Sequence, residues 1–210
     1  ISFVLLSLVF FIRFKRLDKK YLFASLAAGV TTFFGYYLQA FAMTSLGGKP
    51  GRTAFLISTY CVVVPFFSWL VNKKRPDRYN LIAAVMCVSG IALISLPDLI
   101  SDAASPVCLA DLVTLCSSLV FVLNIVAIER MAPKLDTILF TIAHFFVVAI
   151  CAILFTALFE NNSATVWSTQ SISTVLYLAI PCTTVAMLLQ TYGQKYTPAS
   201  TASLFFSLES

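Results

Sequence analysis

The amino-acid sequence predicts an all-α fold, a polytopic bundle of transmembrane helices. Apolar residues make up 60% of the 210 residues and charged residues 11%, which is too little polar surface for a water-soluble globule. Uncharged stretches between successive charges also reach the roughly 20 residues that a helix needs to cross a bilayer. Backbone amides cannot stay unpaired in hydrocarbon, and these stretches do not alternate as barrel strands do, so the spans are expected to be helices.

Polar boundaries divide the chain into successive expected spans. Residues 1–13 are interpreted as the end of a span rather than a signal peptide, because the basic cluster follows the apolar stretch. Residues 161–173 are polar, so the long uncharged stretch that contains them holds one span. The expected spans are 1–13 (partial), 21–44, 53–72, 79–97, 108–128, 137–159, 172–193 and 199 onward (partial). Their short connections predict antiparallel neighbours.

Basic residues indicate the orientation of the spans. If the connection after Ile12 faces the cytoplasm, alternation leaves Lys49 and Arg52 outside and the rest of the 14 Lys and Arg inside. This asymmetry is the one that the positive-inside rule describes. The net charge of +5 is therefore a topological signal, and because the basic residues are dispersed, a nucleic-acid partner is not expected.

The six cysteines are expected to be small apolar packing residues. No C-x-x-C pair is present, so neither a zinc site nor a redox site has its usual spacing, and no cofactor or metal is predicted. H-E-x-x-H motifs, paired aspartates and a nucleophile elbow are also missing, which argues against an enzyme.

An internal repeat links the second and seventh expected spans. Leu38 to Phe41 (LQAF) match Leu189 to Tyr192 (LQTY), and the charge pattern predicts that the two segments cross the membrane in opposite directions. A pattern inserted in both directions is typical of the inverted repeats of secondary transporters.

Longer stretches resemble the EamA-type family of drug/metabolite transporters. In the first half they are Ala54 to Leu56, Tyr60 to Phe66, Lys73 to Pro76 and Gly90; in the second half they are Asp111-Leu112, Glu129-Arg130, Leu189 to Thr197 and Ser207 to Glu209. The resemblance covers nearly the whole chain through an ordered series of individually short matches.

This resemblance implies ten helices in two inverted five-helix repeats, of which the chain would hold six complete helices and two partial ones. Residues 1–97 would form the first repeat without its first helix, 98–106 an external connection, and 107–210 the second repeat up to its ninth helix. It implies a secondary transporter that moves a small organic metabolite across the bacterial inner membrane by alternating access. A coupling proton or ion and a homodimer are compatible with this interpretation. The alternative is a scaffold or lipid-binding bundle without transport activity.

Several side chains are candidates for the substrate path. Gln39 and Gln190 are amides in apolar helices, and they either line the path or join helices by hydrogen bonds. Tyr36 and Tyr60 could offer hydroxyl groups. Glu209 would place a carboxylate inside the membrane, where a charge is costly unless it is paired or hydrated.

His144, the single histidine, either couples a proton or is a buried neutral residue that bonds a neighbour. Glu129 is expected to form a surface ion pair with Arg130.

Hinges are expected where a helix is weakened. Pro65 and Pro181 each remove a helical hydrogen bond, and Gly29 and Gly35 loosen the second span. The repeat aligns Pro181 with Val30, beside Gly29, and such paired weak points are typical of transporter sites. The alternative is an ordinary membrane-helix kink or a glycine that allows close packing.

Overall fold

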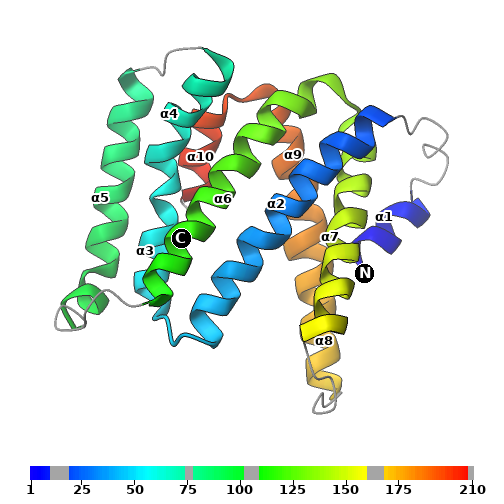
Figure 1. Ribbon diagram of the computed structural model, residues 1–210, viewed down its shortest axis with the longest axis horizontal. Coiled ribbons are helices and arrows are strands. Elements are labelled where there is room, and N and C mark those ends of the chain that lie inside the picture. Colours follow the sequence, from blue (N-terminus) through cyan, green and yellow to red (C-terminus); the bar gives the residue numbers. More distant parts are fainter. Residues whose placement is uncertain (10–18, 74–77, 102–108, 160–167, 208–210) are drawn as a thin grey trace. The chain divides into compact units, whose positions relative to one another are not determined.

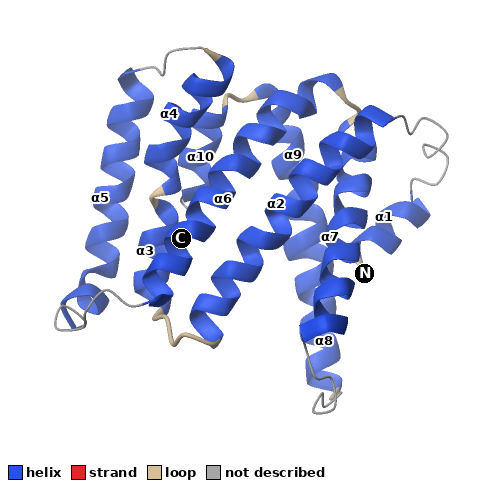
Figure 2. Ribbon diagram, viewed as in Figure 1, coloured by secondary structure: helices blue, strands red, loops and turns tan. Residues whose placement is uncertain are grey.

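The computed structural model describes residues 1–9, 19–73, 78–101, 109–159 and 168–207, and every regular element in these ranges is a helix (Figures 1 and 2). In order they are α1 (Ser2–Val9), α2 (Lys19–Thr44), α3 (Pro50–Ser58), α4 (Tyr60–Asn72), α5 (Arg78–Ser101), α6 (Leu109–Met131), the 3-10 turn η2 (Ala132–Lys134), α7 (Thr137–Phe159), α8 (Thr169–Tyr177), the π-helical segment η4 (Leu178–Val185), α9 (Ala186–Tyr196) and α10 (Ala199–Ser207). The all-α prediction is confirmed.

In the described part of the chain, five helical stretches are long and apolar enough to cross a membrane: Lys20–Thr44, Pro50–Asn72, Leu109–Met131, Thr137–Phe159 and Thr169–Tyr196. Each coincides with an expected span. Two of them contain an interruption of the regular α-helix that hydropathy did not predict. Thr59 separates α3 from α4, and η4 lies between α8 and α9.

Helix ends follow local sequence chemistry. After α2, Gly47 adopts a left-handed conformation (φ 69°), and the N–H of Gly48 turns back to donate to the carbonyl of Ala42 at 2.9 Å. Pro50 starts α3, where its missing N–H has no helical partner to lose. Ser168 caps α8 by accepting a hydrogen bond from the N–H of Ser171 at 3.1 Å.

The chain forms two compact units. Unit 1 contains Ile1–Phe33 and Met131–Tyr196, and unit 2 contains Phe34–Arg130 and Thr197–Ser210. Unit 1 thus holds α1, η2, α7, α8, η4 and α9, and unit 2 holds α3 to α6 and α10, while α2 contributes residues to both. Each unit takes helices from both predicted repeats.

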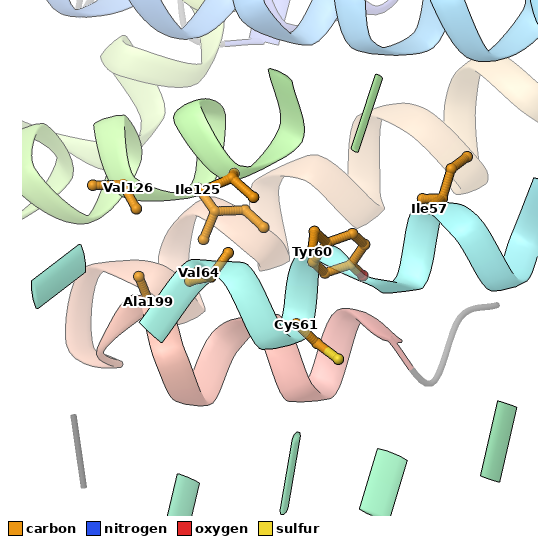
Figure 3. Packing of buried hydrophobic residues seen from close by; sticks show 8 residues of the cluster. Ile57, Tyr60, Cys61, Val64, Ile125, Val126 and Ala199 are labelled. Atoms are coloured by element: carbon orange, nitrogen blue, oxygen red, sulfur yellow. The ribbon is translucent and has the colours of Figure 1, made fainter. Parts of the chain in front are cut away.

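The core of unit 2 lies where α3, α4, α6 and α10 meet. Figure 3 shows its side chains packed between these helices: Ile57, Tyr60, Cys61, Val64, Val122, Ile125, Val126 and Ala199. All of them are at most 7% exposed, so their contribution to stability comes from apolar area removed from solvent and from close packing.

In unit 2, α4 and α10 run antiparallel. Asn72 at the end of α4 and Ala199 at the start of α10 both donate to Glu129. At the other end of α10, the side chain of Ser207 is within hydrogen-bonding distance of that of Cys87 on α5. The thiol of Cys61, at the start of α4, donates to the carbonyl of Ala84, which also lies on α5.

Unit 1 contains a second antiparallel pair, α1 and α7. The ring of Phe3 lies 5.1 Å from that of Phe146, and Leu6 packs against Ile142 and Phe145. Since α1 and α7 are five expected spans apart, as α4 and α10 are, each unit brings together one helix of each repeat at equivalent positions.

Polar contacts also fix which helix ends lie together within each unit. In unit 1 the N–H of Asp136 donates to the hydroxyl of Tyr21 at 3.1 Å, and the ammonium of Lys195 donates to the carbonyl of Leu135 at 3.2 Å. In unit 2 the guanidinium of Arg52 pairs with Asp111 at 2.5 Å. The first and third contacts join helix N-termini, so α2 runs parallel to α7 and α3 parallel to α6, whereas the second places the end of α9 at the start of α7, so these two helices are antiparallel.

Candidate functional site

The predicted substrate-path residues are divided between the two units. Tyr36 and Gln39 of α2 and Tyr60 of α4 belong to unit 2, whereas His144 of α7 and Gln190 of α9 belong to unit 1. Glu209 lies outside the described residues. A common path lined by Gln39 and Gln190 therefore stays a prediction.

The two tyrosines differ in their surroundings. Tyr60 is 6% exposed and lies inside the core of unit 2 (Figure 3), where a packing role explains it. Tyr36 is 54% exposed within the chain and meets the ring of Phe121 edge to face, with centroids 5.1 Å apart. Of the two hydroxyl candidates, Tyr36 is the more accessible.

Gln39 and Gln190 are both half-buried. In the part of the chain that the structure describes, their side chains make no hydrogen bond with another residue. Whether these two amides line a substrate path or join helices stays a prediction.

His144 is buried, with 3% of its surface exposed, and its ring lies 6.0 Å from the rings of Phe140 and Phe145. Its Nε2 atom has no hydrogen-bond partner among the described residues. Burial was expected, but a bond from Nε2 to a neighbour is not what the structure contains.

Gln194 is a residue that the sequence analysis missed. It is 3% exposed, and neither the oxygen nor the nitrogen of its amide has a partner among the described residues. Each buried polar group without a partner costs about 1–3 kcal/mol. Gln194 follows Gln190 by one helical turn, and that spacing could have indicated a second amide on the same face of α9.

Unit 1 contains all the buried side-chain polar atoms that lack a partner in the described ranges. They are Ser7 Oγ on α1, His144 Nε2 on α7, and both amide atoms of Gln194 on α9. Both α1 and α9 pack against α7. Helix α7 and the two helices that pack against it thus each carry a buried polar group without a partner among the described residues.

Comparison with known proteins resolves the class of protein. The EamA-like transporter family matches residues 1–96 and again residues 109–210. The chain belongs to this family.

A protein of Archaeoglobus fulgidus described as an uncharacterized transporter is 29% identical to the EamA-family chain over 185 residues. The match covers 86% of the chain and 55% of that relative, so the chain spans about half of the relative's length. No solved structure matches the chain. Paired helical repeats and several apolar spans identify the EamA-family chain as a multi-pass membrane protein.

Within the described residues of unit 2, no buried side-chain polar atom of this EamA-family chain lacks a hydrogen-bond partner. Glu129 was expected to pair with Arg130, but its carboxylate instead accepts three hydrogen bonds that link α6 to α4 and α10. The donors are Ser68 Oγ at 2.9 Å, Asn72 Nδ2 at 2.6 Å and the N–H of Ala199 at 2.9 Å. Ala199 is the first residue of α10, so by accepting from its backbone N–H Glu129 also caps that helix.

The four hinge candidates have different surroundings. A Cβ atom on Gly29 would lie 2.7 Å from Val147 Cβ, and one on Gly35 would lie 2.9 Å from the ring of Phe121, so both glycines allow close packing. Pro65 is buried inside the continuous helix α4. Pro181 lies within the π-helical segment η4, where the helix departs from regular hydrogen bonding.

Among the described residues, no group of three or more His, Cys, Asp or Glu side chains is placed to hold a metal ion. The groups that remain for chemistry are hydrogen-bonding amides, an imidazole and hydroxyls, which are suited to binding a polar molecule.

Proposed function

We propose that this EamA-family protein is a secondary transporter that moves a small organic metabolite across the membrane by alternating access between two inverted helical repeats. The observation that carries the proposal is the family match to both parts of the chain, residues 1–96 and 109–210. The name of the Archaeoglobus relative, an uncharacterized transporter, agrees with it.

The antiparallel helix pairs support the alternating mechanism. Helices α1 and α7 in unit 1, and α4 and α10 in unit 2, lie at equivalent positions of the two repeats and run in opposite directions. When two halves of one fold are inverted copies, exchanging their conformations converts a state open to one side into a state open to the other. Because each unit contains parts of both repeats, such an exchange would involve helices of both.

We further propose that the protein lies in the plasma membrane, the inner membrane in a bacterial host, with the connection after Ile12 in the cytoplasm. The distribution of Lys and Arg supports this orientation. A coupling proton or ion belongs to the same proposal, because a secondary transporter that concentrates its substrate needs a driving gradient. A homodimer is a separate part of the proposal.

Reconstitution of the full-length protein in liposomes tests the proposal. A panel of labelled amino acids, nucleosides, sugars and organic cations is offered under an imposed proton or sodium gradient, with protein-free liposomes as the control. We expect saturable flux of at least one class. If no compound moves under either gradient, the protein is better described as a scaffold or lipid-binding bundle.

A further inference from the structure

The amide of Gln194 has no partner among the described residues, although the two polar residues nearest to it on α9, Thr191 and Lys195, are bonded. Thr191, one turn earlier on α9, donates its hydroxyl to the carbonyl of Met187 at 2.8 Å. Lys195, the next residue, donates to the carbonyl of Leu135 at 3.2 Å. Hydrogen-bonding groups at this end of α9 are therefore paired at Thr191 and Lys195 but not at Gln194.

Burial makes the missing partners more significant. Gln194 is more than nine-tenths buried, in the apolar span Thr169–Tyr196. An amide in such a place must find donors and acceptors, because no hydrocarbon group can replace water. Neighbouring α7 carries His144, and α1, which also packs on α7, carries Ser7; both have a buried polar atom without a partner in the described ranges.

We infer that Gln194 contacts the transported molecule, with its Nε2 donating to and its Oε1 accepting from one uncharged polar group such as a hydroxyl or a carboxamide. This inference rests on the proposed transport function. A neutral group fits because an amide presents a donor and an acceptor without net charge, and because the ammonium of Lys195 already bonds a backbone carbonyl.

Chemical labelling tests whether a polar molecule can reach this position. Single-cysteine variants Gln194→Cys and Thr191→Cys are made in the full-length protein with its native cysteines replaced, and both are treated in membranes with N-ethylmaleimide. Thr191 is the matched control, because it is similarly buried on the same helix. Because the two positions are equally buried in this structure, only a substrate path that reaches position 194 would make its thiol more accessible, and we then expect labelling at least about tenfold faster there. An unreactive cysteine at this position would overturn the inference.

The variant Gln194→Met separates a ligand contact from a structural role. Methionine keeps the size of the side chain and removes two polar atoms that have no partner in the described fold. We therefore expect a melting temperature equal to or above that of the wild type. A fall in melting temperature would mean that the amide stabilises the protein, and it would contradict the inference.

The same variant is then assayed in liposomes with whichever compound the panel identifies. We expect Gln194→Met to raise KM about tenfold, as for the loss of one or two hydrogen bonds to a buried amide, and Thr191→Val to leave KM unchanged. An unchanged KM in Gln194→Met would overturn the inference even if transport is established. A reactive thiol in Gln194→Cys and a stable Gln194→Met, in a protein without flux, would instead contradict transport and support a binding site.

Discussion

The carboxylate of Glu129 connects α6 to two other helices of unit 2 through three hydrogen bonds, two from α4 and one from α10. It lies near the end of α6, accepts from Ser68 and Asn72 of α4, and accepts from the first N–H of α10. All of these groups donate, so only an acceptor with two oxygens can serve them together. The residue acts as a joint between helices rather than as a surface charge.

We predict that Glu129→Gln destabilises the protein. The amide nitrogen of glutamine cannot accept, so at least one of the donors loses its partner. The free energy of unfolding should fall by about 1–3 kcal/mol. Thermal unfolding of the full-length protein in detergent measures the change.

Arg130→Gln is the control for Glu129→Gln, because Arg130 is the exposed neighbour and its replacement changes the net charge by the same amount in the opposite sense. It should stay within about 0.5 kcal/mol of the wild type. Equal stability of the two variants would show that the hydrogen bonds of Glu129 contribute nothing measurable.

Two glycines of unit 1 provide a second prediction at this scale. A methyl group on Gly29 would collide with Val147 and with the backbone oxygen of His144, whereas nothing lies within 4 Å of the equivalent position on Gly193. Gly29→Ala should lower stability by about 1–3 kcal/mol, as overpacking does.

Gly193→Ala, in contrast, should raise stability by about 0.5–1 kcal/mol, since alanine restricts the unfolded chain and favours a helix. Melting temperatures of the two variants side by side distinguish packing from general helix propensity. A stabilising Gly29→Ala would contradict the close approach of α2 and α7.

At this scale the sequence identified residue types better than their roles. Gln39, Gln190 and His144 are noticeable because polar groups are rare in apolar helices, and that signal is local. The burial of Gln194 and the three partners of Glu129 depend on which helices meet, which hydropathy does not specify. Arg130 also made its neighbour Glu129 look like half of a surface ion pair.

Among the elements, the span Thr169–Tyr196 is the least regular. Pro181 has no N–H to donate to the carbonyl one turn earlier, and the backbone widens into the π-helical η4 around it. Thr183 and Thr184 donate their hydroxyls at 2.7 Å to the carbonyls of Leu178 and Ala179. These bonds satisfy carbonyl groups within the irregular turn and allow it to exist in an apolar environment.

We predict that Pro181→Ala converts η4 into regular α-helix. Alanine restores the N–H, so the backbone should open less often. Amide hydrogen exchange across 178–186 should slow by about tenfold or more. Mass-spectrometric exchange on the reconstituted protein measures it. If η4 also acts as a hinge, the variant should lose transport while keeping its fold.

Thr183→Val keeps the proline and removes one hydroxyl, which makes it the control for Pro181→Ala. It should leave exchange across 178–186 as fast as in the wild type or faster. Unchanged exchange in Pro181→Ala would mean that the proline does not cause the irregularity.

The extent of the spans was predictable, whereas their interruptions were predictable only in part. Hydropathy locates a membrane-spanning helix because lipid surrounds it along its length, so its residues are mostly apolar. Pro181 indicated the weak point in η4. Pro65 was expected to weaken its helix, and its role as a hinge stays a prediction. The break at Thr59 was not expected; beside it the hydroxyl of Ser118 on α6 donates at 3.1 Å to the carbonyl of Ile57. That donor comes from a distant part of the chain.

For the whole molecule, the repeats and the compact units do not coincide. The family matches two successive parts of the chain, yet each unit contains helices from both. The internal similarity of Leu38 to Phe41 and Leu189 to Tyr192 predicted related halves. It contained no information on how those halves interleave, because packing partners far apart in sequence leave no local pattern.

The arrangement of charges makes a prediction at this scale. Reporter fusions after Lys73 and after Lys195 should both indicate the cytoplasm, and a fusion after Lys49 the opposite side. Paired phosphatase and fluorescent-protein reporters provide the measurement. If Lys73 and Lys195 were on different sides, the two repeats would not be inverted.

Interleaving has a consequence for biogenesis. The ribosome delivers α1 to the bilayer long before α7, the helix against which α1 packs in unit 1. Similarly, α4 and α6 are synthesised before α10, whose first N–H donates the third hydrogen bond to Glu129. Because helices that pair across such distances must remain unassociated during synthesis, neither unit is complete until late in insertion. The nascent chain therefore depends on water at the membrane surface or on the insertion machinery to provide partners for its polar groups until then.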